Sequence, residues 1–245
     1  MKPYLVFCLI LTLVVGSCKN NTAVSSDKNT DNTAIKAPAI VFSDLTGTYF
    51  GDFGDNKITV LISAITGDKA EGKTITGSNE VPFEGIIKEE NGRVLVAAHE
   101  MSNANSSGSF QFNFDPANRE VLSGNWKPYK TDAGIASKSF ILNKKKFTYR
   151  KDAGDYPQAS LKILKEADVN NLLKPELVQM RNEIFARHGY SFSDKDIRDQ
   201  FADKDWYLPN STNVSNDLTL IEKKNLVLIK RFENYADQYG SDFGR

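Results

Sequence analysis

Few side chains in this 245-residue sequence are suited to acid–base, nucleophilic or metal chemistry. There are two histidines, His99 and His188, and two cysteines, Cys8 and Cys18, which both lie near the N-terminus. The sequence has neither a G-x-S-x-G nucleophile elbow nor a glycine-rich phosphate-binding loop. These few residues cannot assemble a zinc site of the usual histidine and cysteine type. We therefore expect no metal and no cofactor, and we expect His99, beside Glu100 at a strand end, to lie at a surface or rim.

The pattern closest to a ligand site lies on one predicted helix, from Pro175 to His188. At 100° per residue, Arg181 and His188 share the apolar stripe of this helix. The apolar members of the stripe are Leu177, Met180 and Ile184. Because Arg181 and His188 are two turns apart, both could face a cleft against Trp206 and the last helix. A buried guanidinium needs a partner, so Arg181 should pair with an acidic group or a carbonyl, or stack on Trp206.

Two interpretations of these residues stay open. In the first, Arg181, His188 and Arg187 bind an anionic or sugar-like ligand of the cell envelope. In the second, they cap helix ends and complete a hydrogen-bonded core network, with His188 favoured at the negative end of the helix dipole. The second interpretation is favoured, because motif residues in a small helical module more often specify packing.

Two classes of function also stay open. The preferred class is a non-enzymatic envelope protein that binds or scaffolds a partner, a wall polymer or an apolar ligand. The alternative is a carboxylate-dependent hydrolase of envelope glycans or peptides, since 31 acidic residues offer many pairs and only geometry selects one. An enzyme is thus the less favoured outcome.

The N-terminal segment predicts export and lipid anchoring. Lys2 precedes an apolar run from Tyr4 to Val15 that is too short to span a bilayer. The run ends in Val-Gly-Ser-Cys, which resembles the lipobox of bacterial lipoproteins, so residues 1–17 are predicted to be a signal peptide and Cys18 to be lipidated. Lys19 follows in place of Asp, which is compatible with outer-membrane sorting. We expect a cell-envelope protein, in the periplasm or at the surface, whose first partner is the membrane.

Charge and composition divide the rest of the chain. The sequence holds 31 basic and 31 acidic residues, so it lacks the basic excess of a nucleic-acid binder and no nucleic-acid partner is expected. Residues 18–40 are polar and predicted to form a disordered tether. Residues 41–149 alternate with period two, and residues 150–245 have a period near 3.6. The predicted fold class is α+β multidomain, with an antiparallel β-barrel or meander of about eight strands followed by a small all-α module.

The strand pattern is clearest around the phenylalanines. Phe110, Phe112 and Phe114 fall on one face, and Asn91-Gly92 between two apolar runs predicts a hairpin turn. The predicted strands are Gly47–Phe53, Ile58–Ile65, Thr74–Ser78, Phe83–Lys88, Arg93–His99, Ser109–Phe114, Val121–Trp126 and Lys138–Leu142. With no helix between them, these strands should close on themselves to remove their edges.

The helix pattern is marked by its end signals. Pro175 suits a first helical position, Gly189 the position after a C-terminus, and Ser193 with Asp196 a capping box. The predicted helices are Leu161–Glu166, Pro175–His188, Asp194–Ala202 and Leu218–Tyr239. The predicted buried stripe of the last helix is Ile221, Leu228, Phe232 and Tyr235, with Asn225 on it.

The C-terminal residues resemble a known family. The run from Met180 to Tyr190, followed by Phe192, Ile197, Phe201 and Trp206-Tyr207, is similar to the YARHG domain. The five-residue core of the family stands here as Phe185 to Gly189, with Phe in the tyrosine position. The resemblance covers roughly Leu161 to Phe232. It implies an exported bacterial protein, sometimes with enzymatic domains beside it, and no established molecular activity.

Overall fold

The protein is described here from a computed structural model, which covers residues 42–115, 117–131 and 134–239. The predicted signal peptide (1–17), the predicted lipidation site Cys18 and the predicted tether (18–40) lie outside the described residues. The described residues make up the β domain and the helical module.

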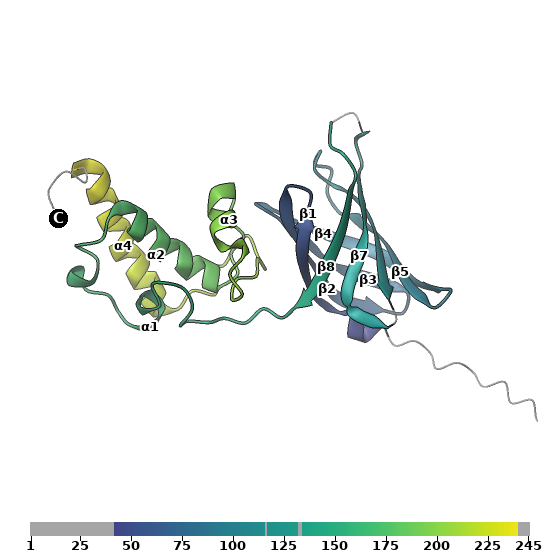
Figure 1. The fold of residues 1–245 in the computed structure, drawn as a ribbon, viewed down its shortest axis with the longest axis horizontal. Helices are drawn as coiled ribbons and strands as arrows, with labels where there is room; N and C mark the ends of the chain where they lie inside the picture. Colours follow the sequence, from purple (N-terminus) through teal and green to yellow (C-terminus); the bar gives the residue numbers. More distant parts are fainter. Residues whose placement is uncertain (1–41, 116, 132–133, 240–245) are drawn as a thin grey trace, which may run out of the picture. The chain divides into compact units, whose positions relative to one another are not determined.

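Eight antiparallel strands form a closed barrel in which each strand pairs with its neighbours in sequence and β1 pairs with β8 (Figure 1). The strands are β1 (Gly47–Phe53), β2 (Asn56–Thr66), β3 (Lys69–Thr76), β4 (Asn79–Glu90), β5 (Arg93–Glu100), β6 (Gly108–Asp115), β7 (Asn118–Pro128) and β8 (Lys138–Lys145). A closed barrel leaves no unpaired edge, and the predicted eight-strand barrel is confirmed.

An aromatic core fills much of the barrel. Phe110, Phe112 and Phe114 are each 1% exposed, and Phe110 also packs against Phe53 and Phe140. The intervening Gln111 faces outward, so the alternation predicted for β6 is correct. The turn between β4 and β5 has positive φ at both Asn91 (53°) and Gly92 (75°), as the Asn-Gly hairpin signal predicts.

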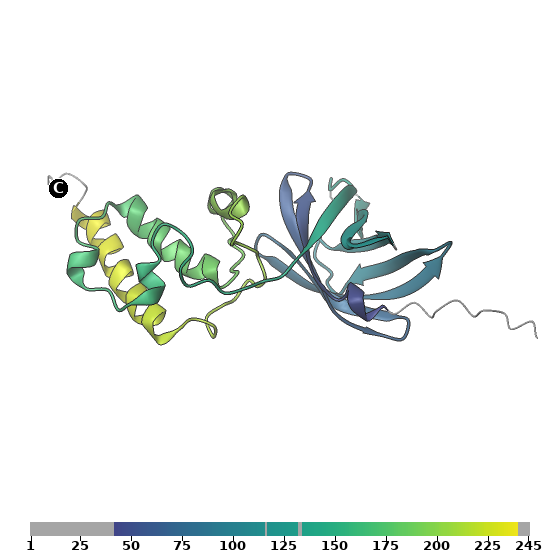
Figure 2. The same ribbon diagram turned by 60° about the horizontal axis from the view of Figure 1, so that its bottom comes forward.

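The helical module contains α1 (Gln158–Leu161), α2 (Lys174–Arg187), α3 (Lys195–Ala202) and α4 (Leu220–Tyr239). Helices α2 and α4 lie side by side, as Figures 1 and 2 both show. Their facing sides bury Leu177, Met180, Ile184 and Ile229 in one core. No helix of the described residues combines the length and the apolar character needed to cross a membrane.

The predicted helix Leu161–Glu166 is wrong. Helix α1 ends at Leu161, Lys162 is extended, and a short 3-10 helix follows at Glu166–Asp168. The cause is Asn225 of α4, whose amide accepts from the Leu164 backbone N–H (2.8 Å) and donates to the backbone carbonyls of Ala159 and Lys162 (2.8 Å each). These contacts hold the segment in an extended course that no local pattern encodes.

Two smaller predictions also need correction. Helix α3 is capped by Asp194, whose side chain accepts from the Asp196 and Ile197 N–H groups, and not by Ser193. Tyr235, predicted to be buried on α4, is 46% exposed. The fully buried positions of α4 include Glu222 and Glu233, because partners in the module compensate their charge.

Candidate functional sites

The first candidate site is a pocket of about 310 Å³ at one end of the barrel. Its lining comes from the end of each odd-numbered strand and the beginning of each even-numbered strand, so one set of hairpins surrounds it. The apolar lining residues are Phe53, Ile58, Val81, Phe110, Trp126 and Ile135. The mouth of a β-barrel is a common place for a small-molecule site, and this volume lies at the lower end of the usual range.

Glu100 places a carboxylate in this pocket although the residue is only 7% exposed. Its Oε1 accepts from the Thr74 hydroxyl (2.5 Å), and its Oε2 accepts from the Gly108 N–H (2.7 Å) and the Trp126 indole N–H (3.4 Å). A carboxylate can accept about four hydrogen bonds, so one acceptor position remains. No local pattern indicates that this glutamate is buried, because it stands next to the exposed His99.

A cation stands at the same pocket. The Lys138 ammonium lies 4.4 Å from the centre of the Phe53 ring and 5.8 Å from that of Trp126. The aromatic faces stabilise the ammonium and hold it over the apolar lining. Ser107, in the adjoining loop, is fully buried, and its Oγ is the one buried side-chain atom recorded without a hydrogen-bond partner in the described chain. The pocket thus combines an apolar body with a carboxylate and an ammonium.

The second candidate site is the charged core of the helical module. Arg187 is 1% exposed, and its guanidinium donates to the Ala153 carbonyl (2.8 Å), the Ser160 hydroxyl (3.0 Å) and Glu183 Oε2 (2.8 Å). Glu183 also accepts from the backbone N–H groups of Asp155 and Tyr156. Burial lowers the pKa of Arg187, an effect that the Glu183 carboxylate opposes. The pair joins the segment before α1 to α2.

His188 belongs to an adjoining network centred on Glu222, which is fully buried. His188 Nε2 lies 2.8 Å from Glu222 Oε2, and the ring stacks on Tyr149 with 4.4 Å between centres. Burial alone would raise the pKa of Glu222, but the hydrogen bonds from His188, Ser160 and Thr219 outweigh it and lower the pKa to about 2. Burial and the Glu222 carboxylate raise the pKa of Tyr149 to about 12, so Tyr149 remains a neutral donor.

The remaining predicted site residues lie elsewhere. Arg181 donates through Nε to Glu233 Oε1 (2.7 Å), which is the acidic partner that its position on the stripe required. Trp206 packs against Phe201 and Tyr207 and lines neither of the two pockets that Arg181 lines. Arg187 and His188 therefore belong to connected hydrogen-bond networks. Arg181 lies apart from them, at a surface that Trp206 does not line.

Sequence reasoning missed the acidic partners of these residues. Glu183 stands four positions before Arg187, a spacing that favours a helical ion pair and could have revealed it. Glu222 and Glu233 also have partners three positions away, Thr219 and Lys230, but their pairing with His188 and Arg181 spans distant parts of the sequence and left no local signal. No group of His, Cys, Asp and Glu within the described ranges is arranged to hold a metal ion.

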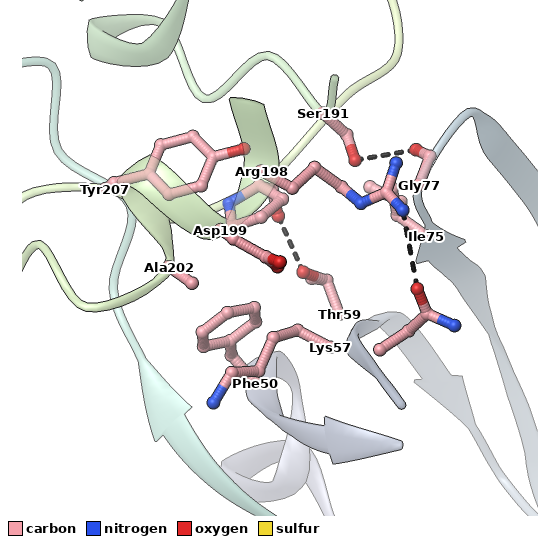
Figure 3. A pocket seen from close by; sticks show the side chains of 12 residues that line it. Phe50, Lys57, Thr59, Ile75, Gly77, Ser191, Arg198, Asp199, Ala202 and Tyr207 are labelled. Carbon is pink, nitrogen blue, oxygen red and sulfur yellow. Dashed lines mark hydrogen bonds between the residues drawn. The ribbon is translucent and has the colours of Figure 1, made fainter. Parts of the chain in front are cut away.

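The barrel and the helical module meet through a few hydrogen bonds around a small pocket (Figure 3). The Thr59 hydroxyl donates to the Pro209 carbonyl and the Ser191 hydroxyl donates to the Gly77 carbonyl, both at 2.7 Å. Arg198 reaches Asn56 Oδ1 at 3.4 Å, and Asn56 also lines the barrel-end pocket. The junction pocket has a volume of only about 30 Å³, about the share of one water molecule, so we read it as a packed contact.

These observations define a two-part protein, a closed antiparallel barrel with a pocket at one end and a helical module with a charged core. Comparison with family models matches residues 153–234 to the YARHG domain. The C-terminal part of the chain is therefore a YARHG domain, as its motif predicted, and such domains are typical of extracellular or periplasmic proteins. Neither the curated proteins nor the solved structures contain a match.

Proposed function

We propose that this protein is an envelope lipoprotein that binds a small amphipathic molecule in the barrel-end pocket. The YARHG domain supports a location outside the cytoplasm, and the Val-Gly-Ser-Cys sequence supports anchoring through Cys18. The observation that carries the binding function is a pocket of about 310 Å³ with an apolar lining and a single buried carboxylate.

The pocket chemistry defines the ligand class. Six apolar side chains would cover the body of the ligand, and burying apolar surface would supply most of the affinity. The open acceptor position of Glu100 fits a hydroxyl or amine donor, and Lys138 fits an anionic group at the entrance. A mostly apolar molecule with a donor group and an acidic group would satisfy all three features.

A fluorescent probe with these features, 1-anilinonaphthalene-8-sulfonate, tests the proposal. In a Trp206→Phe background, Trp126 is the remaining tryptophan and reports directly on the pocket. We expect saturable energy transfer from Trp126 to the probe, and at least about a tenfold loss of affinity in Val81→Phe, where the added ring occupies the pocket. Val227→Phe, a matched change at an exposed position of α4, should leave the affinity unchanged.

Two results would refute this function. One is probe binding that Val81→Phe and Val227→Phe affect equally, since the site would then lie elsewhere. The other is an absence of saturable binding while circular dichroism shows a folded barrel.

Membrane anchoring has its own test. Cys18→Ser should move the protein from the membrane fraction to the soluble fraction, because acyl chains provide the attachment. Cys8→Ser, within the predicted signal peptide, should leave the protein in the membrane fraction. Equal membrane retention of both variants would refute lipid attachment at Cys18.

The alternative of a carboxylate-dependent hydrolase requires two facing carboxylates. The described lining of the barrel-end pocket contains one, Glu100, whose acceptor positions are largely occupied by Thr74, Gly108 and Trp126. No observation in this pocket favours hydrolysis over binding.

A further inference from the structure

A second pocket, separate from the barrel-end pocket, lies in the YARHG domain. It has a volume of about 400 Å³ and lies between α2, the beginning of α3 and residues 212–215. Helix α2 contributes Arg181, Asn182 and Phe185, and Phe185 neighbours the other two on the helix surface because it follows them by four and three positions. Tyr190, directly after the motif, completes this side.

The side chain of Asn182 has no hydrogen-bond partner among the described residues although the residue is only 4% exposed. Asn225, the comparable asparagine of the same domain, makes three hydrogen bonds. In the described chain the fully buried side-chain atom without a partner is Ser107 Oγ, so the amide of Asn182 is not sealed off and stays accessible at the surface of the pocket. Since Asn182 lines the pocket, a bound molecule can supply both the donor and the acceptor that its amide lacks.

Arg181 adds further donors with little net charge. Its Nε is bound to Glu233, and its two terminal nitrogens have no hydrogen-bond partner among the described residues. Lys230 also lies near Glu233, at 3.4 Å. Glu233 and Asp194, which lines the pocket, together offset the charges of Arg181 and Lys230. The site therefore offers directed N–H groups without a strong cationic field, which fits a neutral polar ligand better than a polyanion.

Two partly exposed aromatic rings provide an apolar surface beside these polar groups. Phe185 and Tyr190 lie 5.8 Å apart between ring centres and are inclined by 53°. The carbon-bound hydrogens of a sugar ring pack well on such faces, while its substituents reach the neighbouring polar groups. We propose that this pocket binds an N-acetylated sugar unit of an envelope glycan, with the acetamido group paired to Asn182 and the ring on Phe185 and Tyr190.

The test uses the mature chain carrying Cys18→Ser and a soluble probe, triacetylchitotriose, followed by NMR of side-chain amides. We expect saturable shifts of the Asn182 amide resonances. Maltotriose, which lacks acetamido groups, should bind at least about tenfold more weakly, because it offers the Asn182 amide no acetamido partner. An acidic peptide of similar size should not compete.

The decisive variant is Asn182→Leu, which keeps the size of the side chain and removes its amide. We expect it to abolish triacetylchitotriose binding without lowering the melting temperature, because the amide makes no hydrogen bond with the residues that the structure describes. Asn216→Leu, the same change at an exposed position outside the pocket, should preserve binding.

Several results would overturn the proposal. A destabilised Asn182→Leu that still binds the probe would give Asn182 a structural role alone. Equal binding of the two sugars would remove the acetamido contact, and binding of the acidic peptide in place of sugar would identify a different class of partner. Occupancy of the barrel-end pocket has no bearing on these outcomes, so the two proposals can fail separately.

Discussion

Replacing Arg187 by methionine should destabilise the YARHG domain severely. The variant removes three donated hydrogen bonds and leaves Glu183 buried without its cation. Breaking a buried ion pair by removing one partner typically costs about 3–5 kcal/mol. The backbone N–H groups of Asp155 and Tyr156 still donate to Glu183, so we expect the free energy of unfolding to fall by about 3 kcal/mol, the lower end of this range.

The assay should report on the YARHG domain alone. In a Trp126→Phe background, urea unfolding followed by the fluorescence of Trp206 does so, because Trp206 packs within the helical module. For a domain of this size, about 3 kcal/mol corresponds to a fall in melting temperature of roughly 12–24 °C. Arg187→Lys should also be destabilised, since one ammonium cannot reproduce a planar fork that reaches three acceptors.

The matched control is Arg231→Met. Arg231 also pairs with a glutamate, but the two side chains are 45% and 67% exposed, and such pairs contribute about 1 kcal/mol or less. If Arg187→Met lost no more stability than Arg231→Met, the buried network would not hold the domain together. The interpretation of Arg187 and His188 as ligand-binding residues would then regain the advantage.

Three further predictions address the motif and its network. The pKa of Glu222 is lowered to about 2 from an ordinary 4.5, so its ionised form stabilises the fold above pH 4.5. Roughly 3 kcal/mol of this stability should be lost as the pH falls toward 2, and the stability of Glu222→Gln should depend less on pH over that range. Gly189→Ala should lower the free energy of unfolding in urea by clearly more than about 1 kcal/mol, because φ is +73° and a Cβ would lie 2.8 Å from a backbone oxygen. At Gly92 a Cβ would meet open space, so Gly92→Ala should cost about 1 kcal/mol or less. Equal losses in the two variants would contradict the steric argument. Phe185→Tyr, which restores the family's tyrosine, should change stability by no more than about 0.5 kcal/mol, since this ring is partly exposed, and a larger loss would show that the ring is enclosed.

The barrel could be predicted almost strand by strand because its core obeys a local rule. In β6, every second side chain is a buried phenylalanine, and the same alternation is visible in the sequence alone. Strand β3 was predicted only from Thr74 because its first half is polar. Pairing with β2 and β4 determines that half, and a single-strand pattern carries no record of its neighbours.

The helical module was harder to predict because its core is partly ionic. Glu222 and Glu233 occupy inward positions on α4, so the hydrophobic stripe expected from apolar residues was displaced and Tyr235 was placed inside in error. A glutamate is buried only when specific partners compensate it, and Arg181 and His188, the partners on α2 and at its end, lie more than thirty positions away in the sequence. Long-range polar pairing therefore explains most of the difference between expectation and structure.

Burial divides the YARHG motif in a way that bears on function. Ala186, Arg187, His188 and Gly189 are buried, and the arginine and histidine have their side-chain partners within the domain. Phe185 is the motif position that lines the surface pockets, and it is also the position where this chain departs from the family's tyrosine. The motif is thus best understood as the structural requirement that orients α2. Ligand selection then falls to Asn182 and to the aromatic rings beside it, which a motif defined by packing would not reveal.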